Sequence, residues 1–217
     1  GRVERSYPLP FPESPQFSSS SFKDDFDNNS LNLEWNFRRV PDKDTYEINL
    51  DNGTLRLIAD KDIIKDRKSC SLLGIRQKES NFEFLTKMIF DTDKLEVQSG
   101  ISLFQKDENY FTYTIERYNR QYILKLVLKE QDNEPIIIKD EILSSYNGSI
   151  ILRVLSGNMV YKFYYSLDGP NNYNFLTEID SDKILSKGYT GAYCGLYSST
   201  NGNDIEEYAD FDWVILK

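Results

Sequence analysis

The stretch YILKLVLK, residues 122–129, alternates between two kinds of side chain. Because neighbouring side chains of a β-strand point to opposite faces, every second residue belongs to the same face. The mixed face holds Ile123, Lys125, Val127 and Lys129, and the apolar face holds Tyr122, Leu124, Leu126 and Leu128. Such an alternation predicts a strand in a two-layer fold, with one face of the sheet buried and the other in water.

Short runs of β-branched and aromatic residues recur along the rest of the chain. They are YEINL (46–50), TLRLIA (54–59), LLGIRQ (72–77), FEFLTKMIF (82–90), VQSGISLFQ (97–105), YFTYTIE (110–116), PIIIKDE (135–141), SIILRVL (149–155), MVYKFYYSL (159–167) and TGAYCGLYS (190–198). Turn signals such as DNG (51–53) and NGN (201–203) separate them. The pattern predicts an all-β fold with little helix, namely a two-sheet antiparallel β-sandwich of the jelly-roll type. The run 82–90 is more uniformly apolar toward its end and predicts an inner strand covered on both faces.

The two ends of this region share an alternation of aromatic and aspartate side chains. The segments are FKDDFD (22–27) and YADFDWVILK (208–217). One face of the first holds Phe22, Asp24 and Phe26, and one face of the second holds Ala209, Phe211, Trp213 and Ile215. We therefore predict that the two segments are paired strands of one unit, and that both Trp35 and Trp213 are core residues.

Residues 1–21 differ in composition from everything that follows. This segment, GRVERSYPLPFPESPQFSSSS, holds four of the seven prolines and a serine run. Because proline lacks an N–H donor and fixes φ, we predict an extended linker here, followed by a single sandwich domain over residues 22–217. A chain of 217 residues with 39% hydrophobic content can bury one core of that size.

The net charge limits the kinds of partner that this chain can bind. A formal net charge of −9 repels a phosphate backbone and an anionic membrane surface, so we expect no nucleic acid and no membrane partner. No apolar run approaches the roughly 20 residues of a membrane span. The chain begins without methionine, and we expect it to be a mature, processed or excised piece.

Histidine is absent from the chain, which excludes Ser-His-Asp and Cys-His catalysis and imidazole metal sites. Any catalysis would have to rest on carboxylates. The two cysteines, Cys70 and Cys194, fit no zinc-binding spacing. A disulfide between them and two buried free thiols both remain open interpretations.

Acidic side chains gather in the two terminal segments. They are Asp24, Asp25 and Asp27 in the first and Asp210 and Asp212 in the second. If the strands pair, these carboxylates together with backbone carbonyls can supply the six to eight oxygens that calcium prefers. We therefore consider a structural calcium held by Asp25 and Asp210. The alternative places the aspartates in solvent or at turns, with Arg38 or Arg39 as partners.

Several motifs, taken in order, resemble one family. They are FKDDFDNNSLNLEWNFRRVPD (22–42), LLGIRQKESNFEFLTKMIFD (72–91), QSGISLFQKDENYFTYTIE (98–116), YTGAYCGLYSSTNG (189–202) and YADFDWVILK (208–217). Together they are similar to the C-terminal concanavalin A-like β-sandwich of glycoside hydrolase family 43 β-xylosidases and α-arabinofuranosidases. The resemblance covers about residues 22–216. It implies the same sandwich fold that the strand pattern predicts.

The resemblance also implies a function. In such enzymes a separate five-bladed propeller, which is not in this sequence, carries the carboxylates of inverting hydrolysis. The sandwich packs on the propeller and lends a loop to the rim of the substrate pocket. The matching motif, YTGA, implies that Tyr189 stands at this rim, where relatives often have phenylalanine; the alternative is that Tyr189 caps the sandwich edge. The implied ligands are xylo- and arabino-oligosaccharides of plant cell walls, and the implied setting is extracellular or periplasmic.

Arg76 and Gln77 are further candidates for sugar contacts, because guanidinium and amide groups donate to hydroxyl oxygens. Adjacent residues of a strand face opposite sides, so only one of the two can point into a given cavity. The alternative for Arg76 is an ion pair with a core carboxylate such as Glu116.

Two other classes of function stay open at this point. An independent carbohydrate-binding module needs an exposed aromatic strip, which fifteen tyrosines allow but do not locate. A stand-alone jelly-roll glycosidase needs Glu-x-Asp-x-x-Glu along one strand. The nearest match, EIDSDK (178–183), has Lys183 in place of the second glutamate, which counts against catalysis in this chain.

Overall fold

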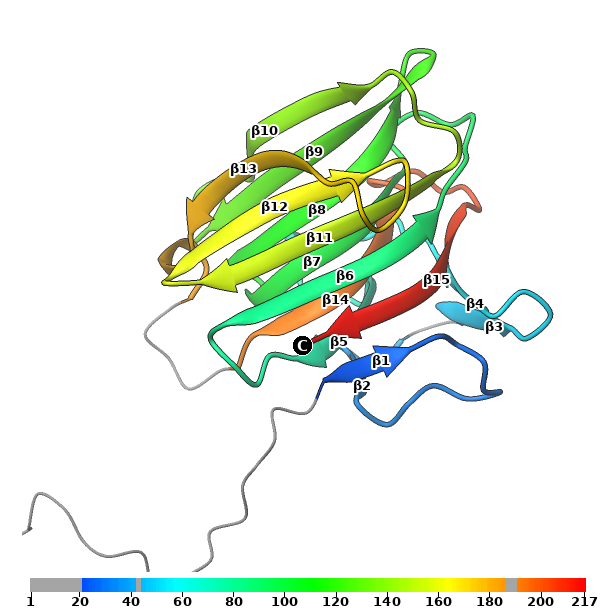
Figure 1. The fold of residues 1–217 in the computed structure, drawn as a ribbon. Helices are drawn as coiled ribbons and strands as arrows, with labels where there is room; N and C mark the ends of the chain where they lie inside the picture. The colour runs from blue at the N-terminus through cyan, green and yellow to red at the C-terminus, as the bar shows by residue number, and fades with distance from the viewer. Residues whose placement is uncertain (1–20, 42–43, 186–190) are drawn as a thin grey trace, which may run out of the picture.

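The computed structural model describes residues 21–41, 44–185 and 191–217, and these are almost entirely β-structure in two facing sheets (Figure 1). Sheet A contains, in spatial order, β13 (Asn174–Asp180), β12 (Val160–Ser166), β11 (Ser149–Gly157), β6 (Phe82–Ile89), β15 (Tyr208–Leu216), β4 (Thr54–Ile58) and β3 (Tyr46–Asn49), with β1 (Phe22–Asp24) paired to β15. Sheet B contains β10 (Ile136–Leu143), β9 (Gln121–Glu130), β8 (Asn109–Tyr118), β7 (Gln98–Lys106), β14 (Tyr193–Ser199), β5 (Ser71–Arg76) and β2 (Trp35–Phe37). The predicted two-sheet antiparallel β-sandwich is confirmed.

Helical structure in the described residues is limited to two 3₁₀ turns, η1 (Ile64–Asp66) and η2 (Ser181–Lys183). Within the described ranges, no helix has the length and apolar character needed to cross a membrane. The turn predictions agree with the backbone: Gly53, in the DNG turn between β3 and β4, has φ +59°, and Gly202 in NGN has φ +91°. Glycine adopts such angles without steric cost, which explains why glycine occupies these turns between strands.

Strand β9 follows the alternation read from YILKLVLK. Leu124 and Leu126 are fully buried between the sheets, and Lys125 lies on the outer face in an ion pair with Glu116 of β8. The core between the sheets is rich in aromatic contacts; for example, the rings of Tyr113 and Phe163 meet at 5.3 Å between centroids in a T-shaped arrangement. Such pairs add stability beyond the apolar area that they bury.

The terminal segments pair as predicted, with Phe22 of β1 opposite Leu216 of β15. The predicted faces are only partly correct, because β15 contains an irregularity between Phe211 and Trp213. This bulge reverses the alternation, so Val214 enters the core and Trp213 lies half-buried on the outer face of sheet A. The prediction that Trp213 is a core residue was therefore wrong.

Two other strand predictions need correction. Strand β6 is an inner strand, but only one of its faces is buried between the sheets, because Glu83 and Lys87 lie on the other face in ion pairs. The sequence analysis also missed β13, whose exposed pattern gives a weak signal. Its last residue, Asp180, precedes η2, so EIDSDK does not lie along one strand face and the glycosidase arrangement is absent from this segment.

A smaller hydrophobic cluster lies on the outer face of sheet B, separate from the main core. It contains Ile64, Cys70, Leu72, Tyr110 and Tyr197, with Phe104 against it. Ile64 and Cys70 belong to residues 61–70, here called the covering loop, which connects β4 to β5. The covering loop therefore buries part of a sheet face that would otherwise be wet, and it shapes the surface on which the candidate site lies.

Candidate functional site

The predicted rim residue Tyr189 lies outside the described residues, and the structure describes the YTGA motif only from Gly191 onward. The N–H of Gln77, just beyond β5, donates to the carbonyl of Ala192 at 2.9 Å. Arg76 stands directly opposite Tyr193 in the register between β5 and β14. The fold thus brings the predicted sugar contacts, Arg76 and Gln77, beside Gly191 and Ala192, the described half of the YTGA motif. We call Arg76, Gln77, Gly191, Ala192 and Tyr193 the rim.

Arg76 is exposed on the outer face of sheet B, because it alternates with the core residue Ile75. Its guanidinium lies close to Gly191: a Cβ on that glycine would come within 2.8 Å of Nη2. The alternative partner, Glu116, instead forms an ion pair with Lys125, so that interpretation of Arg76 was wrong. Among the described residues, Arg76 has no carboxylate partner and is available to a ligand.

Gln77 has a different environment from its neighbour. Its side-chain amide nitrogen donates to the carbonyl of Glu79 at 2.9 Å, within the turn that leads to β6. This local hydrogen bond stabilises the turn and occupies one of the two amide protons. Gln77 therefore contributes to the shape of the rim, and Arg76 is the better placed of the two for a sugar contact.

A small cavity of about 90 Å³ opens beside the rim on sheet B. Its lining includes Gly74, Phe104 and Tyr193, together with Arg38 at one end. Gly74 leaves room for this shape, because a Cβ at this position would make a tight contact of 3.3 Å with the Cβ of Tyr193. The result is an aromatic-walled depression, which suits the edge of one sugar ring more than a chain of rings.

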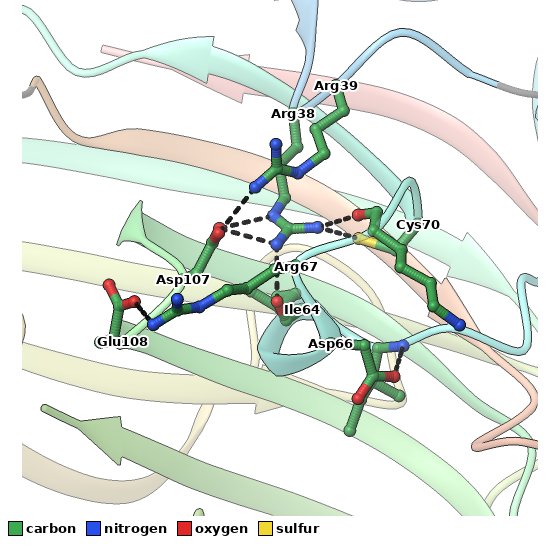
Figure 2. A network of polar contacts seen from close by, with 10 residues as sticks. Arg38, Arg39, Ile64, Asp66, Arg67, Cys70, Asp107 and Glu108 are labelled. Carbon is green, nitrogen blue, oxygen red and sulfur yellow. Dashed lines mark hydrogen bonds and ion pairs between the residues drawn. The ribbon is translucent and has the colours of Figure 1, made fainter. Parts of the chain in front are cut away.

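Arg38, which is one of the lining residues of this depression, also holds the covering loop through a network of polar contacts (Figure 2). Its side chain is 2% exposed, and Nε and Nη2 donate to Oδ1 of Asp107 at 3.0 and 2.7 Å. Nη2 also donates to the carbonyl of Ile64 at 2.7 Å, and Nη1 donates to the carbonyl of Lys68 and to Sγ of Cys70. All five N–H groups of the guanidinium are therefore used, which is how a buried charge is tolerated.

The second oxygen of Asp107 accepts a hydrogen bond from Arg39 at 2.8 Å. The prediction that Arg38 or Arg39 pairs with the terminal aspartates was therefore wrong: both arginines bind the turn between β7 and β8. Sequence reasoning missed this network because its two halves are 69 residues apart. The available signal was two adjacent arginines directly after a short strand.

The two thiols are free and buried, and they lie in different hydrophobic clusters. Burial raises the pKa of the Cys70 thiol to about 11, although the charge of Arg38 acts in the opposite direction. Burial also raises the pKa of Cys194. Both groups are therefore neutral thiols at pH 7, which does not favour a nucleophilic role.

The terminal aspartates are held by separate partners. Asp25 forms an ion pair with Lys23 at 2.7 Å, and Asp210 accepts hydrogen bonds from Nε and Nη2 of Arg56 at 2.8 and 3.0 Å. The hydrogen bond that Arg56 donates to Asp210 raises the pKa of Arg56. In the part of the chain that the structure describes, no group of three or more acidic or thiol side chains is placed to hold a metal ion. Calcium at Asp25 and Asp210 stays a prediction, which a calcium titration of thermal unfolding tests.

Comparison with known proteins supports the motif-based resemblance. A family model described as the beta xylosidase C-terminal concanavalin A-like domain matches residues 23–217. The chain is 26% identical over 215 residues to a non-reducing end α-L-arabinofuranosidase of Bacteroides ovatus, covering 98% of this chain and 40% of the relative. It is 27% identical over 212 residues to a putative β-xylosidase of Escherichia coli, covering 93% of this chain and 39% of the relative. The chain thus spans about two fifths of these curated relatives.

Solved structures show the same fold. A Bacteroides ovatus xyloglucan-PUL protein of glycoside hydrolase family 43 has a TM-score of 0.83 at 24% identity, covering 97% of this chain and 42% of that chain. A family 43 protein of Bacillus licheniformis has a TM-score of 0.80 at 24% identity, over 89% of this chain and 38% of that chain. A Saccharomyces cerevisiae protein, described as functionally unknown, has a TM-score of 0.58 at 15% identity and is 91% covered. That match covers 84% of this chain.

Proposed function

Because this chain belongs to the family of β-xylosidase C-terminal concanavalin A-like domains, we propose that it is the non-catalytic accessory domain of a glycoside hydrolase family 43 enzyme. In this proposal the sandwich packs on a catalytic propeller and completes its substrate pocket. The parent enzyme acts on xylo- or arabino-oligosaccharides from plant cell walls, and it works outside the cell or in the periplasm. This chain covers only about two fifths of the curated relatives, and the remaining part of those proteins is long enough for a catalytic domain.

The observation that carries this proposal is the position of the rim. Arg76 is exposed, has no carboxylate partner among the described residues and lies against Gly191, two positions beyond Tyr189. A free guanidinium beside an aromatic ring can donate to sugar hydroxyls while the ring covers the apolar sugar face. Chemistry would remain with the propeller. The rim would hold the sugar and exclude water from it, which affects substrate binding more than the bond-breaking step.

The test uses the enzyme that contains this domain. Replacing Tyr189 by alanine should raise KM for xylo- or arabino-oligosaccharides by about fivefold or more, with a smaller change in kcat, because contacts to bound substrate are lost. Tyr189→Phe keeps the ring and should stay near the parent value. Unchanged KM and kcat in a folded Tyr189→Ala enzyme would contradict a substrate contact of Tyr189 at the pocket rim. That result would favour the interpretation that Tyr189 caps the sandwich edge.

A further inference from the structure

A cavity lies at the open edge of the sandwich, between β2 of sheet B and β3 of sheet A, and we call it the edge cleft. It has a volume of about 620 Å³, within the range of ligand sites. Its lining includes Asn29, Phe37, Pro41, Asp44, Tyr46 and Glu47. None of these residues was singled out from the sequence for a binding role.

Two aromatic rings, one from each sheet, form the apolar wall of the edge cleft. The ring centroids of Phe37 and Tyr46 are 5.7 Å apart, with 32° between the ring planes. Both rings pack on the main core with one part and remain partly exposed. Their positions are therefore fixed by the core, which gives a preordered aromatic surface at low entropic cost.

The polar wall of the edge cleft is acidic and exposed. Asn29, Asp44 and Glu47 are all exposed, and no lysine or arginine is among the described residues that line this cavity. Carboxylates accept hydrogen bonds from hydroxyl groups, and the asparagine amide both donates and accepts. An anionic ligand would be repelled by the two acids, whereas a neutral polyhydroxylated ligand would find acceptors on one side and aromatic carbon on the other.

A second cavity of about 350 Å³ continues the edge cleft along β3. It shares Glu47 and Ile48 with the first and extends past Leu50 toward Arg56. The two cavities together form an elongated surface, which matches a ligand of several linked units better than a single small molecule. Arg56 is already bound to Asp210, so it adds little free positive charge at that end.

From this combination of aromatic, acidic and elongated surface, we propose that the edge cleft binds a neutral oligosaccharide. Phe37 and Tyr46 would stack on the sugar faces from the core side of the edge strand β3. Asp44 and Asn29, together with Glu47 from the outer side of β3, would bind the hydroxyl groups. This role is separate from the rim and does not depend on it. It would allow the chain to hold a polysaccharide by itself, whether or not a catalytic domain is attached.

The test is a titration of this chain with xylopentaose and with arabinopentaose, followed by NMR at the aromatic and backbone resonances. We expect the largest shifts at Phe37 and Tyr46, with dissociation constants in the micromolar to millimolar range. Tyr46→Ala should weaken binding at least about fivefold. Asp44→Asn and Glu47→Gln, both at exposed positions, should each weaken it about threefold without affecting folding. Phe175→Ala, which removes an exposed aromatic ring at the opposite edge of sheet A, should leave affinity unchanged.

Three outcomes would overturn this inference. The first is the absence of binding to a folded chain by either neutral sugar. The second is binding with shifts confined to Arg76 and Tyr193, which would leave the proposed rim function intact. The third is equal or tighter binding of a glucuronate-bearing oligosaccharide through the cleft, because two exposed carboxylates should disfavour an anion.

Discussion

Arg38 and Arg76 both reach the outer side of sheet B, but their surroundings differ completely. Arg38 is buried, its five N–H groups are used, and it joins the covering loop to the turn between β7 and β8. Arg76 is exposed at the rim and has no carboxylate partner among the described residues. A satisfied, buried guanidinium stabilises the fold, whereas an exposed and unpaired one is free to bind a ligand. Sequence alone does not separate these two roles.

The largest expected effect is on the covering loop. Arg38→Ala should lower the free energy of unfolding by about 3 kcal/mol, because it leaves Oδ1 of Asp107 and two backbone carbonyls without their donor. Urea denaturation followed by intrinsic fluorescence measures this change. The matched control is Arg39→Ala, which removes a 46% exposed arginine from the same aspartate and should cost less than about 1 kcal/mol. Equal losses of stability in the two variants would show that the hydrogen bonds from Arg38 to the covering loop have no special role.

The same comparison can be followed through the Cys70 thiol, which lies under Arg38. In the native chain at pH 8, we expect slow labelling of both cysteines by a thiol reagent, because both are buried. In Arg38→Ala, Cys70 should label at least about tenfold faster while Cys194 does not change, because only the covering loop is loosened. Parallel acceleration at both thiols would indicate global unfolding and contradict a local role.

A raised thiol pKa also has a consequence for stability at high pH. Cys70 has a folded pKa of about 11 against an ordinary value of 9.0, so its contribution to stability is complete below pH 9. As the pH rises from 9 toward 11, the unfolded thiol ionises first and this contribution is lost. Cys70→Ser should therefore show a shallower loss of stability over that interval than the parent chain, as measured by urea denaturation.

Arg153 on sheet A is intermediate between Arg38 and Arg76 in the burial of its side chain. Arg153 is half-buried between the rings of Tyr164 and Tyr173 and forms an ion pair with Glu83, which also binds Lys217. Burial opposes ionisation of Glu83, but the hydrogen bond from Lys217 and the charge of Arg153 outweigh it and lower the pKa below 4.5. This ion pair thus contributes stability at neutral pH that is lost as the pH falls below 4.5 through the folded pKa.

Replacing Glu83 by glutamine tests this case. The variant should be less stable than the parent chain at pH 7, and the difference should shrink as the pH falls toward 3. Thermal unfolding at a series of pH values follows it. Glu178→Gln is a suitable control, because that carboxylate is 55% exposed in its pair with Lys162 and should show little pH-dependent difference. A constant difference for Glu83→Gln at all pH values would indicate lost packing rather than lost charge.

The fold could be predicted from the sequence because strand alternation and turn residues are local signals. YILKLVLK located the buried face of β9 correctly, and the paired ends were found from their shared pattern. The failures also have a local cause: a single bulge moved Trp213 out of the core, and a mostly exposed pattern hid β13. Alternation cannot reveal where an extra residue is inserted.

The candidate sites were less predictable, because they depend on contacts between distant residues. Arg76 and Gln77 were found beside the YTGA motif, but Arg38 and Asp107 meet only after sheet B has formed. The edge cleft likewise joins β2 and β3 from different sheets. No spacing in the sequence indicates that Phe37 and Tyr46 share one wall.

The smallest expected effect on stability is that of replacing Arg76 at the rim. Arg76→Ala should change the free energy of unfolding by less than about 0.5 kcal/mol, because no carboxylate among the described residues depends on it. In the proposed parent enzyme, the same variant should raise KM for the proposed oligosaccharide substrates by about fivefold, because a charged donor to the sugar would be lost. Arg38→Ala should behave in the opposite way, with a large loss of stability. A destabilised Arg76→Ala chain with unchanged KM would show that Arg76 is a structural arginine after all, and the distinction between the two would disappear.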